Sequence, residues 1–131
     1  AVAALYHDAS EILTGDMPTP IKYDNPAIQG AYRDVEKMAE KKLLGMLPQE
    51  LREVYAPILT VPDEETRRLV KAADKLSAHI KCLEELKAGN LEFRQAAEQT
   101  RRALESYDLP EVRYFIDTFL ESFSLSLDEL K

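Results

Sequence analysis

Apolar residues recur every three or four positions along most of the chain, a spacing that predicts amphipathic helices. We expect six helical segments, over about residues 1–13, 26–46, 48–57, 63–89, 90–107 and 110–120. Residues 14–26 hold three prolines and one glycine, which predicts a loop. No stretch shows a convincing strand pattern. The predicted fold class is therefore all-α, and the short connections favour packed antiparallel helices.

The ends of these segments carry local signals. Pro26 and Pro110 can each occupy the first position of a helix, where the missing N–H costs nothing. Asp63 begins an acidic first turn, which suits the positive end of a helix dipole. Gly89 is a good helix C-terminus, and Pro57 is expected to end the third helix.

Two of the predicted helices show a distinct apolar face. In the second helix it comprises Ile28, Ala31, Val35, Met38, Ala39, Leu43 and Met46. In the fourth helix the expected core residues are Leu69, Ala73, Leu76, Ile80 and Leu83. Cys82 is expected to be a small apolar filler beside this face.

Composition fits one soluble domain over residues 1–131. The net charge of −7 argues against binding to nucleic acid polymers or to an anionic membrane. No apolar run approaches the roughly 20 residues that a membrane span needs. Cys82 is the only cysteine, so no intrachain disulfide can form and a cytoplasmic location is the simpler expectation. Because residue 1 is an alanine in sequence typical of a helix interior, we expect the chain to begin partway through a longer protein.

Candidate chemistry begins with the adjacent pair His7 and Asp8. Imidazole and carboxylate are both good ligands for divalent transition metals. If residues 1–13 form one helix, Glu11 lies one turn beyond the pair and faces the same side. A His-Asp dipeptide also arises by chance in a chain of this length, so the pair alone leaves an ordinary surface role open.

Asp74 is a third candidate ligand, on the shoulder of the apolar face of the fourth helix. A carboxylate close to a buried face needs a partner, and a metal ion would supply one. The alternative is a surface aspartate paired with Lys71 or Lys75, or capped by Ser77. His79 lies about 140° around the helix from Asp74, so it is a poor co-ligand and is expected to be structural or solvent-exposed.

The order His-Asp and then Asp on a later helix resembles the HD-domain metal-dependent phosphohydrolases, and most closely the bacterial 5'-deoxynucleotidases. The matching stretches cover nearly the whole chain: His7-Asp8-Ala9-Ser10-Glu11, residues 13–23, Ala73-Asp74-Lys75-Leu76, residues 81–86 and residues 124–129.

This resemblance implies an HD-domain helical bundle that lacks its N-terminal helices, because the family uses an earlier histidine ligand that has no counterpart before His7. It implies one divalent metal ion (Co, Mn, Mg or similar), hydrolysis of a deoxyribonucleoside 5'-monophosphate, and a homodimer. The implied metal ligands are His7, Asp8 and Asp74, and Glu11 is the expected catalytic residue. The implied substrate-binding residues are Asp8, Asp16, Met17, Pro18, Thr19 and Asp74.

Other readings remain open from the sequence. The same superfamily contains triphosphohydrolases and cyclic-nucleotide phosphodiesterases, although the 14–23 loop favours the monophosphatase. A degenerate, non-catalytic module that binds a nucleotide or a protein is a second class. Tyr23, Tyr32 and Tyr55 could stack on a base, but such tyrosines are more often core or rim residues.

Overall fold

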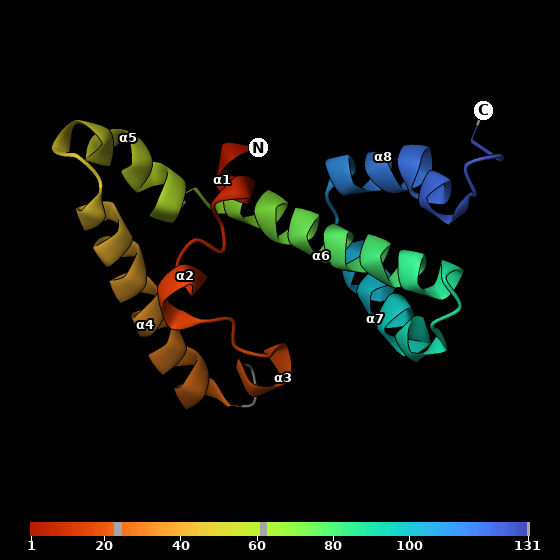
Figure 1. The fold of residues 1–131 in the computed structure, drawn as a ribbon, viewed down its shortest axis with the longest axis horizontal. Coiled ribbons are helices and arrows are strands. Elements are labelled where there is room, and N and C mark those ends of the chain that lie inside the picture. The colour runs from red at the N-terminus through yellow and green to blue at the C-terminus, as the bar shows by residue number, and fades with distance from the viewer. Residues whose placement is uncertain (23–24, 61–62, 131) are drawn as a thin grey trace. The chain divides into compact units, whose positions relative to one another are not determined.

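The computed structural model describes residues 1–22, 25–60 and 63–130, and throughout these ranges the regular structure is helical, as predicted (Figure 1). The chain divides into two compact units, Ala1–Thr66 and Arg67–Lys131. The expectation of a single domain over residues 1–131 stays a prediction. No helix in the described part of the chain is long and apolar enough to cross a membrane.

The N-terminal unit is built on two long helices preceded by three short ones. Its elements are α1 (Val2–Leu5), α2 (Glu11–Thr14), α3 (Thr19–Lys22), α4 (Pro26–Met46) and α5 (Gln49–Thr60). Pro26 opens α4 as predicted, and the Asn25 side chain caps it by accepting the Ile28 N–H at 2.9 Å. Edge-to-face packing of Tyr6 on Tyr55, with ring centroids 5.8 Å apart, joins the end of α1 to α5.

Two boundaries in this unit differ from the sequence prediction. The expected loop contains the helical turn α3, in which the N–H groups of Ile21 and Lys22 both donate to the Pro18 carbonyl. The expected stop at Pro57 is wrong, because α5 continues to Thr60. Pro57 cannot donate to the Glu53 carbonyl, but both residues are exposed, so water can satisfy that carbonyl and the helix need not end.

The shielded side of α4 is also rotated from the predicted apolar face. Tyr32 and Ala39 are the buried residues of this helix, and Ile28 and Leu43 are partly buried. Four members of the predicted face are exposed: Ala31, Val35, Met38 and Met46. Polar contacts of α4 with α2 and α3, given below, select a side that the apolar spacing does not reveal.

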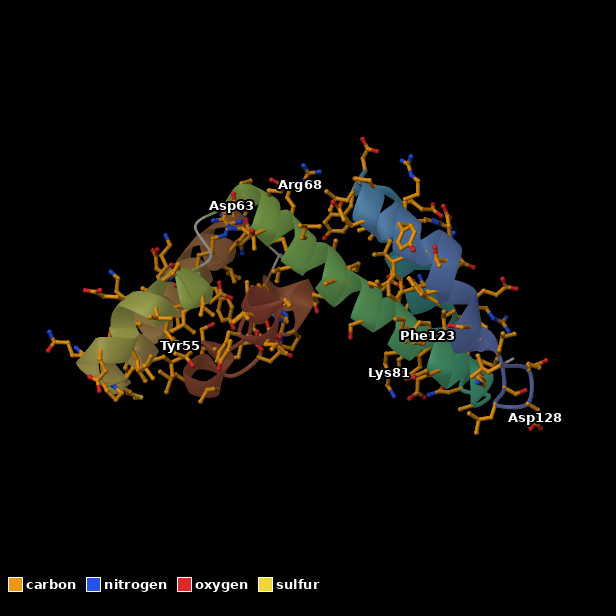
Figure 2. The ribbon with its side chains drawn as sticks, turned by 90° about the horizontal axis from the view of Figure 1, so that it is seen from above. Tyr55, Asp63, Arg68, Lys81, Phe123 and Asp128 are labelled. Carbon is orange, nitrogen blue, oxygen red and sulfur yellow. The ribbon has the colours of Figure 1, made fainter. Side chains whose placement is uncertain are left out.

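The C-terminal unit contains most of α6 (Glu64–Lys87), then η1 (Leu91–Phe93), α7 (Arg94–Glu105), α8 (Pro110–Phe119) and η2 (Leu120–Ser124). Helices α6, α7 and α8 of this unit can be followed in Figure 1. The core joins one residue from each of them, Ala72, Leu104 and Val112. Phe123 of η2 stacks on Phe115 with centroids 6.3 Å apart, which extends the apolar packing toward the C-terminal end (Figure 2).

Both ends of α6 follow the sequence signals. Asp63, labelled at the start of this helix in Figure 2, accepts the Thr66 N–H at 2.7 Å. At the other end Gly89 adopts a φ of 88°, and the Asn90 N–H returns to the Glu85 carbonyl at 2.9 Å. This is a Schellman C-cap, which favours glycine because a side chain is strained at positive φ.

The buried face of α6 is offset from the predicted one. It carries Ala72, His79 and Cys82, whereas Ala73 is exposed, so the assignment of Ala73 to the core is wrong. Ala72 and Ala73 are equally small, so local spacing does not decide which of them is buried. Ala72 is the buried one because it packs with Leu104. The structural reading of His79 is confirmed, as is the reading of Cys82 as a buried filler.

Candidate metal and nucleotide site

The His7-Asp8 pair lies in a turn, and the expectation of one continuous helix over residues 1–13 is wrong. The helix breaks between α1 and α2, where the N–H groups of Ala9 and Glu11 bond carbonyls three residues back. The His7 ring Nδ1–H donates to the Ala4 carbonyl at 2.7 Å. That carbonyl would accept the Asp8 N–H in a continuous helix, so the histidine side chain replaces a helical bond.

The same bond fixes which nitrogen of the neutral His7 ring carries the proton. Because Nδ1 must carry the proton to bond a carbonyl, Nε2 is the nitrogen with the available lone pair in the neutral ring. Metal-binding histidines are commonly oriented through their other nitrogen in this way. Nε2 lies 3.1 Å from Oδ2 of Asp8. Neighbouring ligands at right angles, each roughly 2.1 Å from one ion, lie about 3.0 Å apart, so this donor pair fits a divalent cation.

Glu11 begins α2 and is partly buried beside other carboxylates. Burial raises the pKa of its carboxyl group, and the charges of Asp8, Asp16 and Glu36 raise it further, while Lys22 opposes them. The helix that was expected to place Glu11 beside the His7-Asp8 pair is broken. The charges of Asp8 and Asp16 nevertheless act on the Glu11 carboxyl group. A carboxyl group whose pKa is raised toward neutrality suits proton transfer.

The segment that follows α2 contains the other expected substrate-binding residues. Asp16 is exposed directly after Gly15, Met17 is partly buried, and Pro18 is exposed while its carbonyl closes the turn of α3. Thr19 begins α3, and its side chain lies outside the described part. The N-terminal unit therefore holds His7, Asp8 and Glu11 together with this segment.

Asp74 lies on α6 in the C-terminal unit and is exposed. Its expected place beside the buried face is wrong, because it lies two residues and about 200° around the helix from Ala72. His79 is buried on another side, as its spacing from Asp74 predicted. Within residues 1–22, 25–60 and 63–130 no group of three His, Cys, Asp or Glu side chains is gathered as a metal site. The ligand set of His7, Asp8 and Asp74 stays a prediction.

Contacts from α4 to the loop were missed from the sequence. The Tyr32 hydroxyl donates to the Gly15 carbonyl at 3.1 Å, and Lys22 Nζ lies 2.7 Å from Oε1 of Glu36. The signal available was the spacing of Tyr32 and Glu36, one helical turn apart on one face, with a basic residue ending the proline-rich segment. Tyr32 is thus a core residue.

The other two tyrosines considered for base stacking have different outcomes. Tyr55 is partly buried and packs on Tyr6. Tyr23 lies outside the described residues. The stacking role of either residue stays a prediction.

Nearly the whole chain matches a family model and several known proteins. Residues 1–123 match the family model described as 5'-deoxynucleotidase YfbR-like. A 5'-deoxynucleotidase of Photobacterium profundum is 52% identical over 99% of this chain and 68% of its own length. Those of Vibrio parahaemolyticus and Photorhabdus temperata are 51% and 52% identical over 99% of this chain, covering 68% and 67% of their own lengths. The chain belongs to the YfbR-like 5'-deoxynucleotidase family.

Proposed function

We propose that this protein hydrolyses deoxyribonucleoside 5'-monophosphates to a deoxynucleoside and phosphate, with one divalent metal ion bound by His7, Asp8 and Asp74. The observation that carries the proposal is the His7-Asp8 pair, whose facing donor atoms are 3.1 Å apart while the other ring nitrogen is held by a backbone carbonyl. Membership of the 5'-deoxynucleotidase family supports the reaction and the class of substrate.

The donor set combines one imidazole with carboxylates, and such a set accepts several divalent ions, among them Co, Mn and Mg. Such an ion supplies positive charge beside the phosphate ester and favours the deprotonated form of water. His7 and Asp8 hold their donor atoms on one turn, so little reorganisation is needed at this part of the site. We assign Asp74 as the third ligand on the resemblance of the Ala73-Asp74-Lys75-Leu76 stretch to the family pattern.

Glu11 is proposed to accept a proton from the attacking water. Its partial burial and the carboxylates of Asp8 and Asp16 raise its pKa, which strengthens it as a base. The phosphorus–oxygen bond to the deoxyribose 5'-oxygen breaks as the water oxygen bonds to phosphorus. The proton held on the Glu11 carboxylate can then be returned to the leaving 5'-oxygen.

The segment from Asp16 to Thr19 is proposed to bind the nucleotide. Pro18, within the segment, and Pro20, directly after it, restrict the backbone, which lowers the entropy lost when a substrate binds. Selection of deoxyribose, homodimerisation and a cytoplasmic location are expected from the resemblance and the composition, and they stay predictions.

The test is phosphate release from deoxyadenosine 5'-monophosphate by the wild-type protein and by Glu11→Gln. The amide keeps the shape of the side chain but cannot accept the proton, so kcat should fall by about 10²- to 10⁴-fold. Glu98→Gln is the matched control, because Glu98 is an exposed carboxylate on α7 paired with Arg102. Equal activity of the two variants would exclude Glu11 as the base.

A further inference from the structure

The proposed nucleotide-binding segment lies within Gly15–Lys22, and both ends of this longer segment are attached to one face of α4. At the first end, the Tyr32 hydroxyl donates to the Gly15 carbonyl at 3.1 Å. Gly15 itself ends α2, with a φ of 71° and its N–H bonded to the Glu11 carbonyl at 2.9 Å. Tyr32 therefore contacts the residue that connects Glu11 to the segment. Only 6% of Tyr32 is exposed, although Gly15 is exposed, so the hydroxyl bond is partly shielded from competing water.

At the second end, Lys22 closes α3 and reaches the same face. Its Nζ lies 2.7 Å from Oε1 of Glu36 and 4.6 Å from the ring centroid of Tyr32. The Lys22 and Glu36 side chains are 23% and 24% exposed, so this pair is better shielded than the solvent-exposed pairs that contribute little. Tyr32 thus contacts both ends of the segment, once through its hydroxyl and once through its ring.

The chain between these two anchors has little freedom of its own. Pro18 and Pro20 fix their φ angles, and the Pro18 carbonyl accepts the N–H groups of both Ile21 and Lys22, at 2.9 and 3.0 Å. A short stiff segment that is held at both ends has its position set by its anchors. Loss of one anchor should therefore displace the whole segment and not merely loosen one residue.

We propose that Tyr32 and Glu36 are positioning residues that hold the Gly15–Lys22 segment against α4 in the place where it binds the nucleotide. This inference rests on the proposed function, since it assigns these two residues to the substrate affinity of the same site. Neither residue need touch the substrate, because each acts through a backbone or side-chain contact with the segment.

The test compares Tyr32→Phe with Tyr107→Phe in the otherwise unchanged protein. Each substitution removes a hydroxyl that bonds a backbone carbonyl, and Tyr107 bonds Lys71 in the C-terminal unit. The loss of one such bond corresponds to about a threefold to tenfold effect. Tyr32→Phe should raise KM for deoxyadenosine 5'-monophosphate by that factor with kcat within about twofold, and Tyr107→Phe should leave KM unchanged.

A charge exchange tests the second anchor. Glu36→Lys places two ammonium groups together and should raise KM more than Tyr32→Phe does. Lys22→Glu combined with Glu36→Lys restores an ion pair and should recover part of the loss. A double variant no better than Glu36→Lys would overturn the role of the pair.

Hydrogen exchange provides a readout that does not depend on turnover. In Tyr32→Phe the amides of Ile21 and Lys22 should exchange faster than in the wild-type protein, while those of α7 should not change. Unchanged exchange in residues 15–22, or faster exchange without a change in KM, would overturn the positioning role. Faster exchange in a protein whose wild type releases no phosphate would support the anchoring and would contradict the proposed function instead.

Discussion

Leu104 provides the sharpest test of the core that supports α6. It is 1% exposed and contacts Ala72 and Val112 where α6, α7 and α8 meet. Leu104→Ala removes three carbons, which at about 0.8 kcal/mol per buried methylene amounts to about 2.4 kcal/mol. Ala72 is too small to fill the space that remains, so a cavity term should bring the loss of unfolding free energy to about 3 kcal/mol.

The assay is urea unfolding followed by far-ultraviolet circular dichroism. Leu127→Ala is the matched control, since the same three carbons are removed where the side chain is 87% exposed, and it should change the unfolding free energy by less than about 0.5 kcal/mol. The slope of free energy against urea should be similar in both variants. A loss below about 1 kcal/mol for Leu104→Ala, or no difference between the two, would refute the assignment of the core.

Two further predictions concern stability. Burial, and secondarily the charge of Arg101, lower the pKa of His79, so its contribution to stability is present above the unfolded pKa of about 6.5 and is lost as pH falls through the folded pKa. His79 faces a cavity of about 310 Å³ that Asp117 and Glu121 also line. The variant His79→Gln keeps both acidic residues, and between pH 7.5 and 5 it should lose less unfolding free energy than the wild type does. Identical pH profiles of the two proteins would contradict this. Gly89→Ala should lower the unfolding free energy by about 1 kcal/mol, because φ is 88° there, whereas Gly30→Ala, in the interior of α4 with open space around it, should raise it by about 0.5–1 kcal/mol. Thermal melts of the two glycine variants that shift in the same direction would refute this reading.

Sequence signals for helix ends were reliable where a single residue has a strong physical preference for that position. Pro26 opens α4, Asp63 caps α6, and Gly89 ends it, because each residue suits its position through a missing donor, an acceptor or a tolerated positive φ. Pro57 failed as a stop signal because the cost of a missing hydrogen bond depends on whether the orphan carbonyl reaches water, and that is a property of the folded chain.

The buried side of a helix is set by its contacts with other elements of the chain. These contacts cannot be predicted from the sequence of that helix alone. On α6 the choice of Ala72 over Ala73 is made by Leu104, thirty-two residues later in the sequence. On α4 it is made by polar contacts of Tyr32 and Glu36 with the loop, which an apolar pattern cannot register.

In the candidate site, too, some features could be predicted from the sequence and others depend on the folded chain. The His7-Asp8 pair could be identified from residue chemistry and family resemblance. The turn that holds the pair could not, because it depends on the His7 ring displacing a helical bond at Ala4. The anchoring of the following loop by α4 also required the folded chain.

The most direct test of the central claim is metal-dependent phosphate release from deoxyadenosine and adenosine 5'-monophosphates, comparing the wild-type protein with His7→Ala. The account predicts that Co²⁺, Mn²⁺ or Mg²⁺ supports release from the deoxynucleotide, that the chelated protein is inactive, and that His7→Ala loses both the activity and the affinity for the metal measured by calorimetry. Full activity in His7→Ala, or no release from either nucleotide with any of these metals, would contradict it.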